Sequence, residues 1–302
     1  MNKEDVSRLV AEILGELGKE PMVKASDYKP ASPGPAPAPP EHRDGDFVPD
    51  VTELDLRKLY LTENPANKAQ FARLKERTPA RLGSGRAGPR YKTLTMLRFR
   101  ADHAAAQDAV FTEAPEEFAQ SHGMPEVKTR CHDKEEYLTR PDLGRCFDEE
   151  TKKTIASRYP QPPRVQLLIG DGLSSAAIMA NAMDCADAIR DGLKLRNIPC
   201  ADPLFIRYCR VGAGDAVGDV TGCEVVCLLV GERPGLVTDK SMSCYITYRP
   251  HTGVSESSRT VVSNIHAQGP PAAEAGAHIA ELLETILRRQ VSGVGLNLEA
   301  AQ

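Results

Sequence analysis

Residues 165–196, VQLLIGDGLSSAAIMANAMDCADAIRDGLKLR, decide the fold class of this chain. An apolar run over 165–169 ends in the glycine-rich turn Gly170-Asp171-Gly172, and a helical pattern follows over 175–196. Further strands are expected at 204–208, 224–230, 244–248 and 259–264, with helices at 214–220 and 271–290. Because the strands are apolar on both faces, they predict a largely parallel sheet covered on both sides, a doubly wound α/β domain over 161–302.

The first 49 residues have a different character. Residues 1–20, MNKEDVSRLVAEILGELGKE, carry apolar residues at helical spacings, which predicts a short amphipathic helix with one apolar stripe. Residues 21–49 contain eight prolines, which predicts an extended, flexible linker. A helix on such a tether is suited to a groove on another protein, and docking on its own fold is the alternative.

Residues 50–160 are expected to form a mainly helical N-terminal domain. Helices are expected at 55–61, 66–76, 95–108 and 113–121, with one short strand at 126–129. In the third of these helices Met96, Leu97, Ala101, Ala104 and Ala105 fall together, which predicts a buried or half-buried face.

Composition and charge exclude several classes of function. Lys and Arg number 38 and Asp and Glu 42, a net charge of -4, which excludes a globally basic nucleic-acid-binding protein. No apolar run approaches the roughly 18–20 residues that cross a membrane, and the N-terminus lacks the apolar segment of a secretory signal. The eight cysteines form no C-x-x-C pair and no metal-ligand spacing, so we expect reduced thiols in a cytoplasmic protein, without a structural metal.

Polar, glycine-rich turns follow four of the expected strands. They are 170–174, 210–212, 231–235 and 263–266. Because the carboxyl ends of parallel strands meet at one edge, these turns predict a ligand site there, with Asp171, Glu232 and Asn264 as hydrogen-bonding groups. Each turn by itself is also explained as a capped connection from strand to helix.

Sequence motifs of catalysis are absent. There is no G-x-S-x-G, P-loop, H-E-x-x-H or adjacent Cys/His couple. Residues 83–88 match G-x-G-x-x-G, but no strand precedes them and Pro89 follows, so they are not a dinucleotide-binding loop. From Arg73 to Arg100 there are nine Lys or Arg and one acid, Glu76. This stretch predicts an interface with an acidic partner or a phosphate contact, a solvated basic face being the alternative.

Seven blocks of the sequence resemble the small (light) subunit of ethanolamine ammonia-lyase. They are GRAGPR (85–90), LRF and ADH (97–103), YLTRPDLGR (137–145), DGLS (171–174), GERPGL (231–236), SCY (243–245) and SNIH (263–266). The resemblance extends over about residues 50–297, and the blocks occur in the family's order.

The resemblance implies the small subunit of an adenosylcobalamin-dependent lyase that converts ethanolamine to acetaldehyde and ammonia. In that family a large TIM-barrel subunit holds the substrate and carries out the radical chemistry. The small subunit supplies part of the cobalamin site from a Rossmann-like domain, which explains the missing catalytic residues. We therefore expect a carbon–nitrogen lyase subunit that is inactive without the large subunit.

The resemblance also implies a site and a location. The family's cobalamin contacts correspond to Val211, Glu232 and Val261, the last at a position that is often cysteine. The sequence lacks D-x-H-x-x-G, whose histidine replaces the cofactor's own base on cobalt, so we expect base-on cobalamin. Residues 1–20 resemble helices that bind shell proteins of the ethanolamine microcompartment, which implies a cytoplasmic location inside a bacterial microcompartment.

Two other classes stay open. One is a stand-alone α/β enzyme with a nucleotide cofactor, for which 170–174 is only a partial phosphate loop. The other is a scaffold or adaptor protein that links an enzyme to a microcompartment shell, which the tethered helix would support. Binding of nucleic acid or of a membrane surface is not expected.

Overall fold

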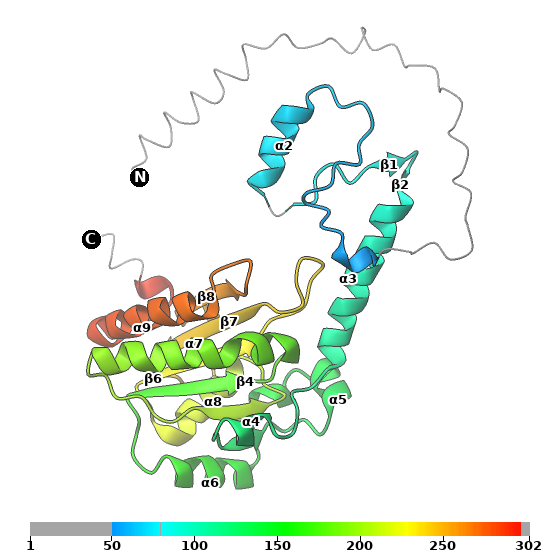
Figure 1. Cartoon of the computed structure of the whole chain (residues 1–302). Helices are drawn as coiled ribbons and strands as arrows, with labels where there is room; N and C mark the ends of the chain where they lie inside the picture. The colour runs from blue at the N-terminus through cyan, green and yellow to red at the C-terminus, as the bar shows by residue number, and fades with distance from the viewer. Residues whose placement is uncertain (1–49, 79, 297–302) are drawn as a thin grey trace. The chain divides into compact units, whose positions relative to one another are not determined.

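A six-stranded sheet organises the part of the chain that the computed structural model describes, residues 50–78 and 80–296 (Figure 1). Its strand order is β3-β5-β4-β6-β7-β8. The strands are β3 (Glu126–Lys128), β4 (Val165–Gly170), β5 (Leu204–Arg207), β6 (Val225–Gly231), β7 (Met242–Tyr248) and β8 (Arg259–Ile265). The helix expected at 1–20 and the linker expected at 21–49 lie outside the described residues.

The sheet is mixed, because one strand runs against the other five. β3, β5, β4 and β6 are parallel, whereas β7 is antiparallel to both β6 and β8. The carboxyl ends of β4, β5, β6 and β8 therefore share one edge. The α/β class is confirmed, and every expected strand forms within two residues of its expected bounds.

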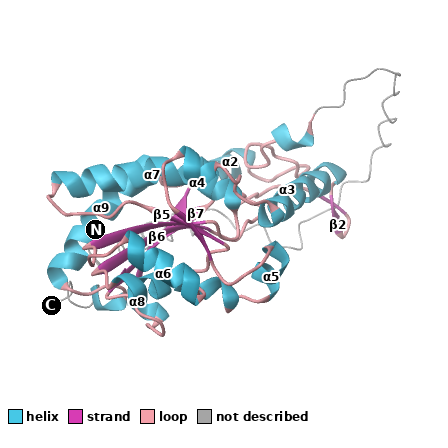
Figure 2. Ribbon diagram, turned by 90° about the horizontal axis from the view of Figure 1, so that it is seen from below, coloured by secondary structure: helices cyan, strands magenta, loops and turns pink. Residues whose placement is uncertain are grey.

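Helices cover both faces of the sheet (Figure 2). α7 (Ser175–Leu195) and α9 (Ala272–Arg289) lie on one face, and α6 (Glu149–Arg158) and α8 (Gly212–Thr221) lie on the other. α7 begins where the Ser174 hydroxyl accepts a hydrogen bond from the Ala177 amide at 3.0 Å. α7 and α9 approach closely, because a Cβ added to Gly192 would lie only 2.6 Å from the Ala280 Cβ.

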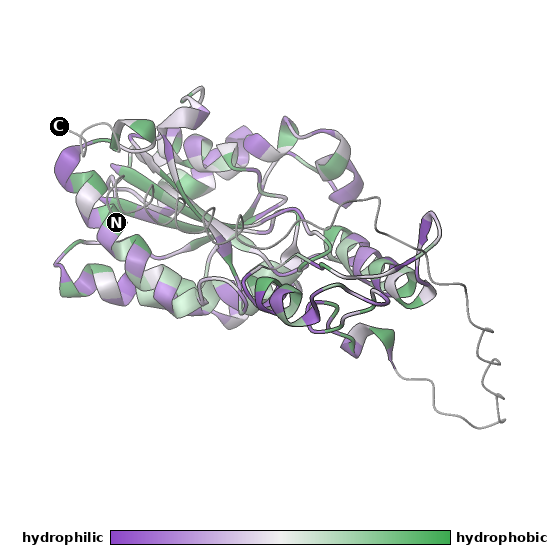
Figure 3. Cartoon of the chain, turned by 90° about the horizontal axis from the view of Figure 1, so that it is seen from above, coloured by the Kyte–Doolittle hydropathy of each residue, from purple (hydrophilic) through white to green (hydrophobic). Residues whose placement is uncertain are grey.

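Alternation along the strands builds two apolar cores. On the α7 and α9 face, β6 contributes Val225, Cys227 and Leu229, and on the α8 face it contributes Val226, Leu228 and Val230. β4 and β6 are buried along their whole length. Figure 3, coloured by hydropathy, shows that the strands at the centre of the sheet are mostly hydrophobic. Strands in this position are apolar on both sides, which is why the sequence identifies them so clearly.

The region before β4 contains short elements around one long helix. These are η2 (Val51–Glu53), α2 (Lys68–Glu76), β1 (Arg86–Ala87), β2 (Arg90–Tyr91), α3 (Thr93–Phe111), α4 (Phe118–Ser121), α5 (Lys134–Thr139) and η3 (Leu143–Arg145), and η4 (Glu256–Ser258) comes later. β3 pairs with β5, and the side chains of Phe118 and Ile155 enter the two cores of the sheet. The domain boundary expected between residues 160 and 161 stays a prediction.

The prediction of a helix at 55–61 is wrong, because no helix forms there. The buried Lys75 ammonium donates hydrogen bonds to the carbonyls of Leu56, Leu59 and Leu82 at 2.9, 2.6 and 2.5 Å. In a helix over 55–61 the Leu56 carbonyl would accept the amide four residues later, so its hydrogen bond from Lys75 takes the place of a helical one. The conformation of this loop therefore depends on Lys75, which lies 16 to 19 residues further along the chain. The local sequence pattern of residues 55–61 gives no sign of this interaction.

Two further helix expectations need correction. Of the helix expected at 113–121 only Phe118–Ser121 forms, because the Ala114 amide donates to the Asp171 carboxylate at 3.0 Å and holds the preceding segment against the sheet. α3 is longer than expected, and its buried residues are Thr95, Ala106 and Ala109. Of the face predicted to be buried, Leu97, Ala104 and Ala105 are exposed and Met96 and Ala101 half-buried.

Candidate functional site

The four polar turns meet at one edge of the sheet, but the turn after β4 is closed to a ligand. Asp171 is buried, and its carboxylate accepts hydrogen bonds from the Ser175 hydroxyl at 2.5 Å and from the Ala114 amide at 3.0 Å. The expectation that Asp171 offers a group to a ligand is therefore wrong. Its two oxygens instead join three segments of the chain.

The crevice on either side of β4 is filled by the chain itself. In the strand order β5-β4-β6 the switch point, at which doubly wound proteins bind nucleotides, lies between β4 and β6, and there the Leu173 amide donates to the Gly231 carbonyl at 3.1 Å. Between the ends of β4 and β5, Lys134 donates to the Gly172 carbonyl at 3.1 Å, and the Tyr137 hydroxyl donates to the Cys209 carbonyl at 3.0 Å. Burial lowers the pKa of Lys134. The filled crevice argues against the stand-alone enzyme with a nucleotide cofactor.

Two of the three predicted site residues lie together beyond this crevice, around Tyr245 on β7. The Tyr245 hydroxyl donates to Glu232 Oε1 at 2.7 Å, and Tyr245 stands directly opposite Val261 on β8. Burial, and then the hydrogen bond to Glu232, raise the pKa of Tyr245, so that its hydroxyl stays a donor. Val261 is 44% exposed, so this end of the sheet is open to a ligand.

Val211, the third predicted residue, lies on the same face of the sheet. It is the N-cap residue of α8 and packs against the core cluster of Leu228 and Val230, which Tyr245 also borders. The row Leu228, Tyr245 and Val261 crosses three neighbouring strands on this face. The structure thus joins Tyr245 to Glu232 by a hydrogen bond, pairs Tyr245 with Val261 across two strands, and sets Val211 at the border of the same core.

Arg210 adds a cation beside Val211. Its guanidinium lies 4.2 Å from the centre of the Tyr137 ring and donates from Nη2 to the Tyr137 carbonyl at 2.8 Å. The buried Nε has no hydrogen-bond partner among the described residues. A buried N–H without a partner costs free energy, about 1–3 kcal/mol, so this donor is available to a ligand.

Asn264 is the last residue but one of β8, at the same edge of the sheet. Its φ of 59° is left-handed, a conformation that asparagine tolerates better than most residues. Its side-chain amide donates a long hydrogen bond of 3.4 Å to the Ser263 hydroxyl, and both side chains are exposed. Asn264 therefore keeps the hydrogen-bonding capacity expected of it.

The groups near this end of the sheet are of mixed character. Val211 and Val261 offer apolar contact, while the second Glu232 oxygen, the Arg210 Nε–H and the Asn264 amide offer hydrogen bonds. A corrinoid has methyl groups and carboxamides around its rim, so these residues fit it. Within the described ranges no group of three or more His, Cys, Asp or Glu is arranged to hold a metal ion.

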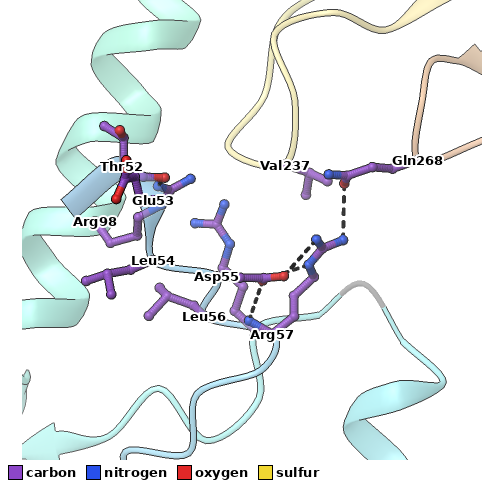
Figure 4. Close-up of a pocket in the computed structure, with 10 residues that line it drawn as sticks. Thr52, Glu53, Leu54, Asp55, Leu56, Arg57, Arg98, Val237 and Gln268 are labelled. Carbon is purple, nitrogen blue, oxygen red and sulfur yellow. Dashed lines mark hydrogen bonds and ion pairs between the residues drawn. The ribbon is translucent and has the colours of Figure 1, made fainter. Parts of the chain in front are cut away.

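A separate cavity of about 260 Å³ lies where the 52–57 segment meets the loops after β6 and β8 (Figure 4). Asp55 accepts from Arg57 Nε at 2.9 Å and from Nη2 at 3.0 Å, and Arg57 Nη1 donates to Gln268 at 3.1 Å. The Arg57 hydrogen bond lowers the pKa of Asp55 to about 2. Arg81 and Arg98, which also line the cavity, both pair with Asp102. Each arginine therefore has a carboxylate partner, although Arg81 and Arg98 share Asp102, and Glu53 in the lining supplies a third negative charge.

The fold and the site define an α/β protein with a candidate ligand-binding face at the carboxyl edge of a mixed sheet. Within residues 50–78 and 80–296, no helix is both long and apolar enough to cross a membrane.

Comparison with known proteins gives the family. The chain belongs to the family described as Ethanolamine ammonia-lyase light chain (EutC), whose model matches residues 68–297. The chain is 50% identical over 300 residues to a protein of Clostridium perfringens, 52% identical over 297 residues to one of Clostridioides difficile, and 47% identical over 296 residues to one of Listeria innocua. Each alignment covers 98% of this chain and the whole of the relative, and each relative is named ethanolamine ammonia-lyase small subunit.

Sequence reasoning missed Tyr245 as a member of this site, whereas Arg210 lies in the predicted ligand turn 210–212. Alternation in β7 puts Ser243, Tyr245 and Thr247 on one face, so the strand pattern was a usable signal for Tyr245. The Arg210 contact with Tyr137 joins residues 73 positions apart and has no local signal.

Proposed function

We propose that this chain is the cobalamin-covering small subunit of an adenosylcobalamin-dependent ethanolamine ammonia-lyase. The enzyme would convert ethanolamine to acetaldehyde and ammonia, with the substrate held by a large subunit. Membership of the family supports the reaction. The observation that carries the cofactor role is the hydrogen bond from Tyr245 to Glu232, together with the exposed Val261 that pairs with Tyr245 across β7 and β8.

Each residue of this face has a role that follows from its chemistry. Val211 and Val261 would pack against methyl groups at the corrin rim, and Glu232 would accept a hydrogen bond from a corrin carboxamide. Tyr245 would hold Glu232 in place, and the Arg210 Nε–H would donate to an amide oxygen. When bound, adenosylcobalamin supplies homolysis of its cobalt–carbon bond. This chain's part is to bind, orient and exclude water, which agrees with the absence of catalytic motifs in its sequence.

Titration of the assembled complex with adenosylcobalamin in the dark, followed by the cobalamin absorbance spectrum, tests this role. Glu232→Gln and Tyr245→Phe should each weaken binding about tenfold or more, because a hydrogen bond to a charged group contributes about 1.5–3 kcal/mol. Tyr248→Phe is the matched control, since Tyr248 is on the same strand but packs against the opposite core. Unchanged affinity in both test variants would remove this face from the cobalamin site.

The base-on state has its own test. In cob(II)alamin the lower axial nitrogen splits the electron paramagnetic resonance signal of cobalt. Labelling only the protein with ¹⁵N should leave this splitting unchanged, because the ligand is expected to be the cofactor's own base. A changed splitting would show that a protein histidine has replaced the base.

We also propose that residues 1–20 direct the enzyme to the shell of a bacterial microcompartment. The support is the apolar stripe of the sequence and the proline-rich segment that follows it. Residues 1–20 fused to a fluorescent protein should give punctate fluorescence in shell-forming cells, and Leu14→Asp, which interrupts the stripe, should make it diffuse. Should the full chain bind shell protein but neither the large subunit nor cobalamin, the adaptor function would replace the lyase function.

A further inference from the structure

α3 carries apolar residues around most of its circumference, and the side that it buries is partly polar. Its buried side carries Thr95, Arg98, Asp102, Ala106 and Ala109, at spacings of three and four residues. Arg98 and Asp102 form an ion pair at 2.9 Å, and Arg81 also pairs with Asp102. Polar pairing rather than apolar contact therefore attaches much of this helix to the rest of the chain.

The opposite side of α3 is an apolar stripe of Leu94, Leu97, Ala101, Ala104 and Phe111. These residues also recur at helical spacings, so they lie along one side of the helix. Leu97 is 45% exposed and Phe111 67% exposed. Most of the stripe belongs to the face that the sequence predicts to be buried, yet four of its five residues are exposed in the described part of the chain.

Exposed apolar side chains concentrate around this helix. Of the twelve large hydrophobic residues exposed in the described part of the chain, six lie within residues 74–111. A contiguous exposed apolar surface usually marks an interaction site. A helix with an apolar side of this length is suited to a groove on a partner protein.

Charge near the stripe indicates the kind of partner. Arg90, just before α3, and Arg100, beside the stripe, are exposed and have no ion-pair partner among the described residues. Asp108 is an acid that interrupts the stripe between Ala104 and Phe111. The whole stretch from Arg73 to Arg100 has nine basic residues and one acidic residue, so a second copy of this region would double the excess of positive charge.

We infer that the apolar stripe of α3 docks into an apolar groove of the large subunit that is bordered by carboxylates. This inference rests on the proposed function, because it takes the large subunit of the same enzyme as the partner. Loop residues Leu236 and Val237 are exposed at the carboxyl edge of the sheet, and the Leu236 carbonyl accepts a hydrogen bond from Arg81, which pairs with Asp102 on the buried side of α3. The loop that follows Glu232 is therefore joined to the α3 region.

The test is the affinity of the full-length chain for an immobilised large subunit. Leu97→Asp should weaken binding at least about tenfold, because it places a charge at the centre of the stripe. Leu195→Asp is the matched control: Leu195 is 82% exposed at the end of α7 and should tolerate the change without effect. Arg100→Glu should also weaken binding and reduce its dependence on salt. Circular dichroism melts should be unchanged for all three variants, since each side chain is already exposed.

Each outcome is distinguishable. Absence of binding by the unsubstituted chain would refute the proposed function itself. Normal binding by both the unsubstituted chain and Leu97→Asp would overturn only the inference about α3, whether the stripe is then covered by residues 1–20 or by nothing. A dimer of the chain alone that Leu97→Asp converts to monomer would assign the stripe to a second copy and would also overturn the inference.

Discussion

The buried ion pair between Asp215 and Arg259 offers the sharpest test of how the candidate face is held. Asp215 lies on α8, whose N-cap residue is Val211, and Arg259 begins β8, which carries Val261. The two side chains are 6% and 3% exposed, and two parallel hydrogen bonds of 2.7 Å join them. The Asp215 hydrogen bond raises the pKa of Arg259, so the guanidinium stays charged wherever the protein is folded.

Asp215→Ala leaves this charge buried without its main partner. Thr247 still accepts a hydrogen bond at 3.1 Å, and exposed Glu256 accepts another at 2.8 Å. Removing one member of a buried pair costs about 3–5 kcal/mol. Because Thr247 and Glu256 remain, we expect the lower end, a loss of about 3 kcal/mol in the free energy of unfolding.

Urea denaturation of the full chain measures this loss. The midpoint should fall with little change in slope, since the surface exposed on unfolding is nearly the same. The double variant Asp215→Leu with Arg259→Met should be more stable than Asp215→Ala, because no unpaired charge remains. A loss below about 1 kcal/mol for Asp215→Ala, the range of an exposed pair, would refute this account of the buried pair.

Two further predictions concern packing and thiol chemistry. Gly231→Ala should destabilise the chain by about 1–3 kcal/mol, because the new Cβ would lie 2.0 Å from the Ser174 carbonyl oxygen, whereas Gly235→Ala, with no atom within 4 Å, should be nearly neutral in the same denaturation assay. Burial raises the pKa of Cys185 to about 12, so at pH 8 only about one thiolate in ten thousand forms. Iodoacetamide followed by mass spectrometry should therefore modify half-buried Cys146 and leave Cys185 unmodified until the chain unfolds, and early labelling of Cys185 would contradict the burial argument.

The second half of the chain was predictable because its signals are local. Strands buried on both faces must be apolar throughout, and β4 and β6 show this as continuous runs ended by glycine. The turns after β4, β5, β6 and β8 were assigned to one edge because parallel strands bring their carboxyl ends together. Glu232 and Val261 could be named from the family resemblance, but strand pairing aligns Val261 with Tyr245 and Leu228, and the hydrogen bond from Tyr245 to Glu232 is visible only in the folded chain.

The first half was less predictable because distant groups control it. Lys75 takes the carbonyls of the 55–61 segment, and Asp171 takes the Ala114 amide, so both expected helices are replaced or shortened. The same long-range effect removed Asp171 from the list of ligand groups, since its oxygens are used within the chain.

The amino-acid sequence was sufficient for the α/β class, the order of strands along the chain and the family, because each depends on runs of neighbouring residues. Three features could be seen only in the tertiary structure. β7 runs antiparallel to β6, Tyr245 donates a hydrogen bond to Glu232, and Leu94, Leu97 and Phe111 of α3 are exposed. The physical reason is that a side chain's neighbours across strands and between helices come from distant positions. Periodicity can predict that apolar residues recur along α3, but which of them are covered depends on segments that are distant in the sequence.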